Sequence, residues 1–319
     1  MTTNIIAGIW RNAPFQGSII SSIYRLNKFL EEQEIDMKYD IMPLAPGELS
    51  KNMTLPNVFI FDGGEDVDPG RYEENNRYSH FSKARDKIEF DFAKFMANNG
   101  IKMCGICRGH QLLNVFKGGT LFQDIRKDGC IPSGISHHSG HKVKVPRKGN
   151  YSHHSKILEI ADFVGLHSFA VSSLHHQSIH HFGRNILPSL VWEQYKETRQ
   201  GRISGYVIEG IESIDSMIRG VQSHPEFKGY SKDGLLFAYL MFVDHFSASL
   251  TKVTDEQVAR KFSNLIKQKQ ADINSGKNQY VNMSRRNDVP EVATNPARRM
   301  RTYSRRNSPD LERAIREEE

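Results

Sequence analysis

The sequence has few cysteines and no long apolar run. Its 3 cysteines in 319 residues are too few, and odd in number, for the disulfide framework of a secreted domain. The longest uninterrupted apolar run, residues 235–243, is far shorter than the roughly 20 residues that a membrane-spanning helix needs. Residues 1–12 lack the basic region and apolar core of a signal peptide. We therefore expect a cytoplasmic protein without a membrane partner.

The sequence also lacks an obvious set of metal ligands. Cys104 and Cys107 form one C-x-x-C pair, and no second pair completes a zinc site of that type. Ten of the 14 histidines fall between His137 and His181, so this segment could offer ligands. Few carboxylates accompany these histidines, however, and histidines adjacent in sequence usually point in different directions. We expect them to belong to a substrate-binding loop or to the surface, with no metal ion and no other cofactor.

Positive charge is concentrated near the C-terminus. The chain carries a formal net charge of +6, and seven arginines against two acidic residues lie between Ser284 and Arg306. The rest of the chain is therefore nearly neutral. No stacking aromatic pattern or DNA-binding motif accompanies the arginines. We expect a solvated tail, with a weak contact to nucleic acid or to an acidic protein as the alternative.

The first 250 residues alternate short apolar runs with longer amphipathic stretches, which is the pattern of a parallel α/β sheet flanked by helices. Strands are predicted at 4–9, 37–42, 58–61, 101–106, 205–211 and 217–221. Helices are predicted at 18–33, 84–98, 109–116 and 233–246. The segment 128–181 is rich in His, Ser and Gly and has no regular period.

The character of the sequence changes after residue 250. Residues 255–270 have the spacing of one amphipathic helix. From residue 274 the chain is polar, Arg-rich and broken by prolines, so it cannot bury enough apolar surface to offset chain entropy. We predict a folded domain over 1–250, an amphipathic helix within 251–273 and a mostly disordered tail over 274–319.

Residues 101–111, with the sequence IKMCGICRGHQ, carry the strongest chemical signal. An apolar strand runs into G-I-C-R-G and then into a helix. Glycines on both sides of Cys107 suit a sharp strand-to-helix turn into which few side chains fit. A thiol at a helix N-terminus is favoured as the reactive thiolate. The sequence thus indicates a nucleophile; a buried structural cysteine and a redox pair with Cys104 are the alternatives.

A thiol nucleophile needs a base, and the base needs an orienting group. The segment 221–227, VQSHPEF, follows an apolar strand. His224 and Glu226 are two residues apart in an extended segment, so their side chains project to the same side. Glu226 can then accept a hydrogen bond from one imidazole nitrogen while the other faces the thiol.

The motifs resemble those of the class I glutamine amidotransferase-like superfamily, in which G-x-C-x-G-x-Q is followed by H-P-E. They are similar in particular to its γ-glutamyl-γ-aminobutyrate hydrolase branch, the peptidase C26 group. Further blocks of this resemblance are 63–69, Arg85-Asp86, 118–124 and 173–177. It covers residues 4–247 and implies a flavodoxin-like α/β fold, with a mostly parallel sheet flanked by helices, as the catalytic domain.

The resemblance also implies roles for individual residues. Cys107 would be the nucleophile, His224 the general base and acid, and Glu226 its orienting group. The backbone N–H groups of Gly64 and Arg108 would hold the oxyanion. The glutamyl pocket would be lined by Gln111, Ser172, Ser173 and His175.

Three functions are compatible with these residues. The first is a free-standing enzyme that hydrolyses a γ-glutamyl amide through a thioester on Cys107, with a small γ-glutamyl molecule as substrate. The second is a glutaminase subunit that passes ammonia from glutamine to a partner synthetase, since the chain itself has no phosphate-binding loop of the G-x-x-x-x-G-K-[ST] type. The third is a non-catalytic binding protein that has kept the fold.

Overall fold

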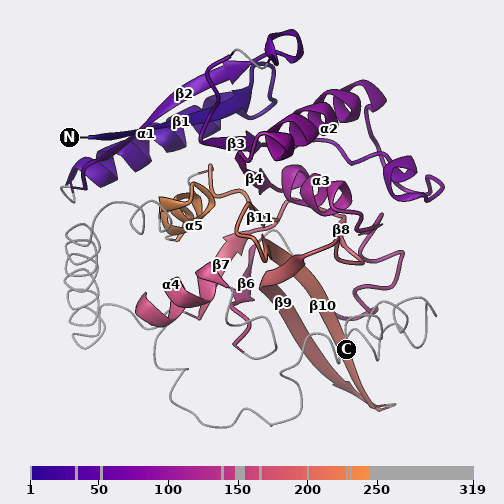
Figure 1. Cartoon of the computed structure of the whole chain (residues 1–319). Coiled ribbons are helices and arrows are strands. Elements are labelled where there is room, and N and C mark those ends of the chain that lie inside the picture. Colours follow the sequence, from indigo (N-terminus) through magenta and orange to yellow (C-terminus); the bar gives the residue numbers. More distant parts are fainter. Residues whose placement is uncertain are drawn as a thin grey trace, which may run out of the picture.

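The structure is a computed structural model built around one large sheet (Figure 1). It describes residues 2–32, 35–50, 53–137, 140–147, 155–164, 167–199, 201–227, 229 and 232–243. The nine strands lie in the order β2 (Met37–Leu44), β1 (Thr3–Trp10), β3 (Val58–Phe61), β4 (Lys102–Ile106), β11 (Ile218–Val221), β10 (Gly201–Ser213), β9 (Ile186–Thr198), β6 (Gly140–Lys144) and β7 (Ser168–Ser172). Two short strands, β5 (Leu121–Phe122) and β8 (Ser178–Ile179), pair separately.

The helices are α1 (Gln16–Glu32), α2 (Lys83–Asn98), α3 (Arg108–Phe116), α4 (Lys156–Val164) and α5 (Asp233–Leu240), with short 3-10 turns at Pro46–Glu48 and Pro69–Tyr72. Ser82 caps α2, because its hydroxyl accepts a hydrogen bond from the Arg85 N–H. Among the described residues, no helix combines the length and the apolar character needed to cross a membrane.

One half of the sheet is parallel and matches the sequence prediction. Strands β2, β1, β3, β4 and β11 all run in the same direction. Every residue of β3 is buried, as expected for a parallel strand covered on both faces. The predicted α/β fold, with a mostly parallel sheet between helices, is confirmed in this half.

Helices cover both faces of the parallel half, and the alternation along β3 shows how the cores divide. Val58 and Ile60 lie in one core with residues of α1, α4 and α5. Phe59 and Phe61 lie in a second core with residues of α2 and α3. Figure 1 shows α1 and α5 on one side of these strands and α2 and α3 on the other.

The other half of the sheet is antiparallel, and the sequence analysis missed most of it. Strand β11 pairs with β10, and β10, β9, β6 and β7 follow in antiparallel order. Of β10, only residues 205–211 were predicted. No helix or strand was predicted in the segment 128–181, which was wrong, because this segment contains β6, α4, β7 and β8. Strands β6 and β7 are short and alternate between exposed and buried residues, so pairing with neighbours distant in sequence defines them rather than a long apolar run.

The structure describes only part of the C-terminal region for which the sequence makes predictions. The predicted helix 233–246 is present as α5, which ends at Leu240, and its last three residues lie outside the described residues. The predicted helix 255–270 and the predicted tail 274–319 also lie outside them.

Two glycines allow α3 to pack closely on the sheet. A Cβ on Gly105 would lie 2.5 Å from the carbonyl oxygen of Gly109. A Cβ on Gly109 would lie 2.6 Å from the carbonyl carbon of Phe61, at the end of β3. Real Cβ atoms essentially never come this close to backbone atoms. The glycines of the G-x-C-x-G motif are therefore required by packing, as well as by the turn.

We expect Gly109→Ala to lower the free energy of unfolding by about 1–3 kcal/mol, because the added methyl group overlaps backbone atoms that cannot move aside. Gly17→Ala is the matched control: Gly17 also lies in a helix, but a Cβ there meets nothing within 4 Å. That substitution should leave stability unchanged or raise it by up to about 1 kcal/mol. Urea unfolding followed by circular dichroism measures both values; equal effects would contradict the packing argument.

Candidate active site

Three neighbouring parallel strands deliver the predicted catalytic segments to one edge of the sheet. Strand β4 lies between β3 and β11, and all three end at the same edge. The loop of Gly63 and Gly64 follows β3, Cys107 follows β4, and His224 follows β11. A Cβ on Gly63 would lie 2.7 Å from Cε1 of His224, so the first and third segments are in direct contact. Such an edge is where ligands bind in open α/β sheets.

Cys107 occupies a strained turn at the start of α3. Its φ of 51° and ψ of −103° place it in a region that side chains rarely adopt, and its backbone N–H donates to the carbonyl of Val221 at 2.8 Å. The residue is 6% exposed. Since Cys107 is the N-cap of α3, its thiol sits at the positive end of the helix dipole.

His224 is held in a fixed orientation on the other side of this edge. Its Nδ1 lies 2.7 Å from Oε1 of Glu226, which leaves Nε2 as the nitrogen available to Cys107. Phe227 stacks on the imidazole with a centroid distance of 4.8 Å and an interplanar angle of 7°. The backbone N–H of His224 donates to the hydroxyl of Ser172 at 2.9 Å.

The electrostatics of His224 favour the imidazolium form. Burial lowers the pKa of His224, but hydrogen bonds and opposite charges from Cys107 and Glu226 outweigh burial and raise this pKa to about 10. At neutral pH the site therefore holds His224 as a protonated imidazolium that interacts with Cys107.

Both predicted oxyanion donors lie beside this pair. Arg108 is the first residue of α3, so its N–H has no carbonyl acceptor within the helix. Gly64 has a φ of +138°, and its Cβ position is filled by the guanidinium of Arg85. The Arg85 guanidinium also donates to the carbonyl of Gly63 at 2.8 Å, which fixes the loop. The predicted donors thus belong to two rigid segments that flank Cys107.

A buried charge network holds these two segments together. Arg85 pairs with Asp62 at 2.9 Å and with Glu89 at 3.0 Å, and Arg108 pairs with Asp86 and Glu89. All five side chains are at most 6% exposed. Burial raises the pKa of Asp62 to about 6, although the charge of Arg85 opposes that shift. The network pairs the Arg108 side chain with two carboxylates of α2, while the backbone of Arg108 begins α3 directly after Cys107.

The sequence analysis missed Gln222, which contacts the thiol directly. Its Nε2 lies 3.5 Å from Sγ of Cys107, and its Oε1 accepts a hydrogen bond from Nε2 of Gln111 at 3.0 Å. The signal was the position of Gln222 directly after β11 and two residues before His224. The extended backbone predicted there gives way to a turn, in which the N–H of Phe227 donates to the carbonyl of His224 at 3.2 Å. Gln111, predicted in the glutamyl pocket, is thus linked to Cys107 through Gln222.

The remaining predicted pocket residues lie at the end of β7 and in the segment that follows it. Ser172 supports the backbone of His224, as described above. Ser173 lies 3.5 Å from Nδ1 of His137, and Nδ1 of His175 lies 2.8 Å from the carbonyl oxygen of Gln177. The structure directs Ser173 and His175 toward a cluster of histidines around Glu209 rather than toward Cys107.

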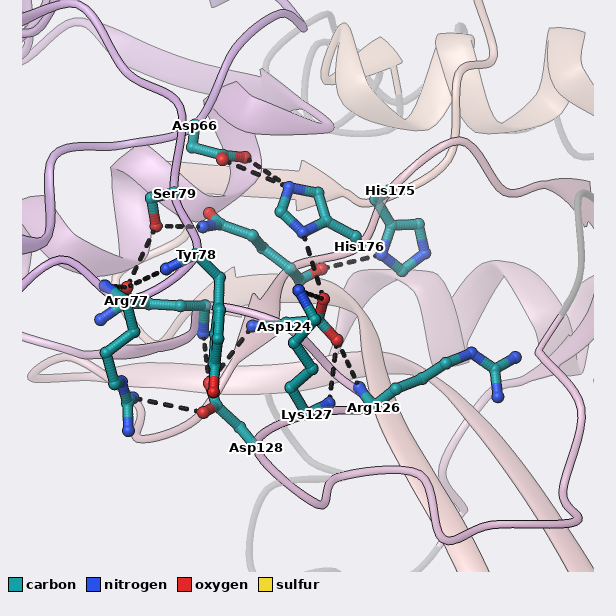
Figure 2. A network of polar contacts seen from close by, with 12 residues as sticks. Asp66, Arg77, Tyr78, Ser79, Asp124, Arg126, Lys127, Asp128, His175 and His176 are labelled. Atoms are coloured by element: carbon teal, nitrogen blue, oxygen red, sulfur yellow. Dashed lines mark hydrogen bonds and ion pairs between the residues drawn. The ribbon is translucent and has the colours of Figure 1, made fainter.

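Polar contacts fasten this segment to its surroundings, as Figure 2 shows. His176 lies between the carboxylates of Asp66, at 3.1 Å, and Asp124, at 3.9 Å. Its hydrogen bond to Asp66 raises the pKa of His176 above the ordinary value, against the opposing effect of burial. Gln177 donates to the hydroxyl of Ser79 at 2.7 Å. The segment that carries Ser173 and His175 is therefore held from both sides.

One group of described residues has the composition of a metal site, although the sequence analysis expected none. His137, His141 and Glu209 bring ligand atoms to within 4.8 Å of one another. Nε2 of His175 lies 3.6 Å from the same Glu209 carboxylate. The sequence signal for Glu209 was an acidic residue between apolar residues of a predicted strand. In the structure, Glu209 and its neighbours on β10 are buried.

We expect Glu226→Gln to lower the pKa of His224 from about 10, because the negative charge that stabilises the imidazolium is lost while a hydrogen-bond acceptor remains. Since the protonated ring is needed to release the leaving amine, activity should fall above pH 10 in the native protein, and this decline should move to lower pH in the variant. Titration of ¹⁵N-labelled histidine by NMR measures the pKa.

The exposed Glu65 serves as the matched control, and Glu65→Gln should leave the His224 titration unchanged. A His224 that titrates near its ordinary value in the native protein would contradict the charge pair.

Comparisons with known proteins identify relatives of this chain. The family model of peptidase C26 matches residues 41–226, which is more than half of the chain. A Schizosaccharomyces pombe protein, provisionally named glutamine amidotransferase PB2B2.05, is 33% identical over 192 residues, which cover 57% of this chain and 67% of that protein. A Lactococcus lactis protein, provisionally named glutamine amidotransferase-like protein YvdE, is 29% identical over 220 residues, which cover 67% of this chain and 84% of that protein.

Among solved structures, a glutamine amidotransferase from Thermotoga maritima aligns with 83% of this chain and 99% of its own, at 14% identity and a TM-score of 0.44. The family match spans the strand ends that carry Cys107 and His224, and it ends at Glu226. The chain belongs to the peptidase C26 family.

Proposed function

We propose that this protein hydrolyses the amide bond of a γ-glutamyl compound, with Cys107 as the nucleophile. One observation carries the proposal: a thiol at the strained N-terminus of α3 interacts with a histidine that Glu226 orients at 2.7 Å. A binding protein has no need of such an arrangement, whereas acyl transfer through a thioester requires each part of it.

The first half of the reaction forms the acyl-enzyme. The Cys107 thiolate attacks the γ-carbonyl carbon of the substrate, and a C–S bond forms as the carbonyl oxygen becomes an oxyanion. The N–H groups of Gly64 and Arg108 stabilise that charge. The C–N bond then breaks as Nε2 of His224 gives its proton to the departing amine. The products are the free amine and a glutamyl thioester on Cys107.

The second half releases glutamate. His224, now neutral, takes a proton from a water molecule, and the resulting hydroxide attacks the thioester carbon. The C–S bond breaks, Cys107 leaves as the thiolate, and His224 is again the imidazolium. Gln222 contributes a hydrogen bond to Sγ at 3.5 Å, which helps to hold the thiolate in both its attacking and its leaving role.

A second candidate is a glutaminase that supplies ammonia to a separate synthetase. The observation that favours it is the naming of two relatives as glutamine amidotransferase or amidotransferase-like. The acyl-enzyme is the same in both cases, and only the leaving group differs: ammonia from glutamine, or a larger amine from a γ-glutamyl amine. The choice between the two is therefore a question of substrate preference.

We expect the full-length protein to release glutamate from γ-glutamyl-γ-aminobutyrate faster than from glutamine. The Cys107→Ala variant should lose activity by roughly 10³-fold or more, because the covalent route is removed. Glutamate release measured on both substrates in parallel checks this expectation. Turnover of glutamine alone would favour the glutaminase subunit.

Cys104→Ala provides the matched control, because Cys104 is a buried thiol on β4, three residues before Cys107. Burial raises the pKa of Cys104 well above its ordinary value, so we expect it to stay a thiol and the variant to stay active. Activity that survives Cys107→Ala, or that is lost equally in both variants, would contradict the proposed nucleophile.

A further inference from the structure

Three histidines converge on one buried carboxylate in the antiparallel half of the sheet. Oε1 of Glu209 lies 3.1 Å from Nε2 of His137, 3.0 Å from Nε2 of His141 and 3.6 Å from Nε2 of His175. The four side chains are only 1–6% exposed. They come from four separate places: the segment before β6, β6 itself, the segment after β7, and β10. A carboxylate at this depth requires strong partners.

Hydrogen bonds between these groups do not satisfy the cluster. Nδ1 of His175 lies 2.8 Å from the carbonyl oxygen of Gln177, which can only accept, so Nδ1 carries the proton (Figure 2). Nε2 is then the nitrogen that faces the carboxylate of Glu209, at 3.6 Å from Oε1. Among the described residues, Nε2 of His175 and Oε2 of Glu209 are buried and have no hydrogen-bond partner. A cation between these atoms would satisfy both.

The distances from Glu209 to two of the histidines are close to those between ligands of one zinc ion. Zn–N and Zn–O bonds of 2.0–2.1 Å place neighbouring ligand atoms about 3.3 Å apart. The Nε2–Oε1 distances are 3.1 Å for His137 and 3.0 Å for His141, and the ligand atoms of these three residues all lie within 4.8 Å of one another. Imidazole nitrogens with one carboxylate are a donor set that zinc binds readily.

The surroundings of the cluster are those of a metal site. Metal-binding histidines usually donate their second N–H to a carbonyl or another polar group. His175 has the Gln177 carbonyl in this position, and His137 has the hydroxyl of Ser173 at 3.5 Å. The buried ring of Trp192 packs edge-on against His137 with a centroid distance of 4.8 Å, which gives the site an apolar wall.

We propose that His137, His141 and Glu209 bind one zinc ion, next to His175. Contact with this group replaces the substrate contact that the sequence predicts for His175. The ion would join β6, β10 and the segment before β6. The segment 123–137 contains no helix or strand and packs on a small core of six buried residues: Ile125, Cys130, Ile131, Ile135, Trp192 and Val207.

The same ion would also stabilise a residue that is hydrogen-bonded to the edge of the active site. The backbone carbonyl of Glu209 accepts a hydrogen bond from the N–H of Gln222 at 2.9 Å, and the Gln222 side chain contacts Cys107. Glu209 therefore connects the proposed zinc site to the segment that carries His224. The inference does not depend on the proposed reaction, because ligand binding here can be measured without a substrate.

The proposal is tested on the full-length protein by elemental analysis and by metal substitution. We expect one zinc per chain after purification. After removal by a chelator, added Co²⁺ should give the intense visible absorption bands of tetrahedral cobalt, and zinc should abolish them. Zinc should also raise the melting temperature of the metal-free protein, because it binds the folded state. Absence of retained zinc together with absence of cobalt bands would overturn the proposal.

Glu209→Gln is the informative variant, since it keeps the shape of the side chain and removes its charge. It should lose the bound zinc, the cobalt bands and the zinc-dependent rise in melting temperature, and His137→Ala should do the same. His176→Ala is the control: this neighbouring histidine is 48% exposed, pairs with Asp66 and should retain all three properties. Two results would overturn the proposal. One is an equal zinc content in all variants. The other is a native protein that holds no metal, together with a Glu209→Gln variant that changes only KM.

Discussion

The buried ion network of Asp62, Arg85, Asp86, Glu89 and Arg108 is the interaction on which the catalytic edge depends. It connects the end of β3, the first turns of α2 and the first residue of α3 at positions almost without solvent. Removing one partner from such a buried network costs about 3–5 kcal/mol, because the other charge is left uncompensated. The network thus ties the position of the Gly63-Gly64 loop to that of the helix that begins after Cys107.

Tight packing and charge pairing act together at this edge. Gly105 and Gly109 allow α3 to approach the ends of β3 and β4, which brings the helix N-terminus under the thiol. His224, which follows the adjacent strand β11, places its imidazolium at the same edge. Each contribution is modest in water, but in a buried site with fixed partners it is far stronger. The chemistry follows from the positions at which three adjacent parallel strands end.

The sequence predicted the parallel half of the fold because its strands are buried on both faces and therefore appear as continuous apolar runs. The predicted pairing of His224 with Glu226 rests on short-range spacing, and in the structure Nδ1 of His224 lies 2.7 Å from Oε1 of Glu226. The antiparallel half was missed because β6 and β7 are half-exposed, and their identity depends on pairing with β9 and with each other. The sequence did not predict the cluster of Glu209 and its histidines for a related reason. His137 lies 72 residues away from Glu209 in the chain, so only the fold brings them together.

Two parts of the sheet therefore have different roles in this account. In the proposed reaction the parallel half provides the nucleophile, the base and the oxyanion donors, and the antiparallel half supports them through Ser172 and the backbone of Glu209.

Mass spectrometry of the acyl-enzyme tests the central claim most directly. The full-length protein would be mixed with a γ-glutamyl amide, quenched in acid within one turnover and mapped peptide by peptide. The account predicts that the peptide containing Cys107 gains the mass of one glutamyl residue, while peptides with Cys130 remain unmodified. Turnover of substrate without any adduct, or with an adduct on a residue other than Cys107, would contradict it.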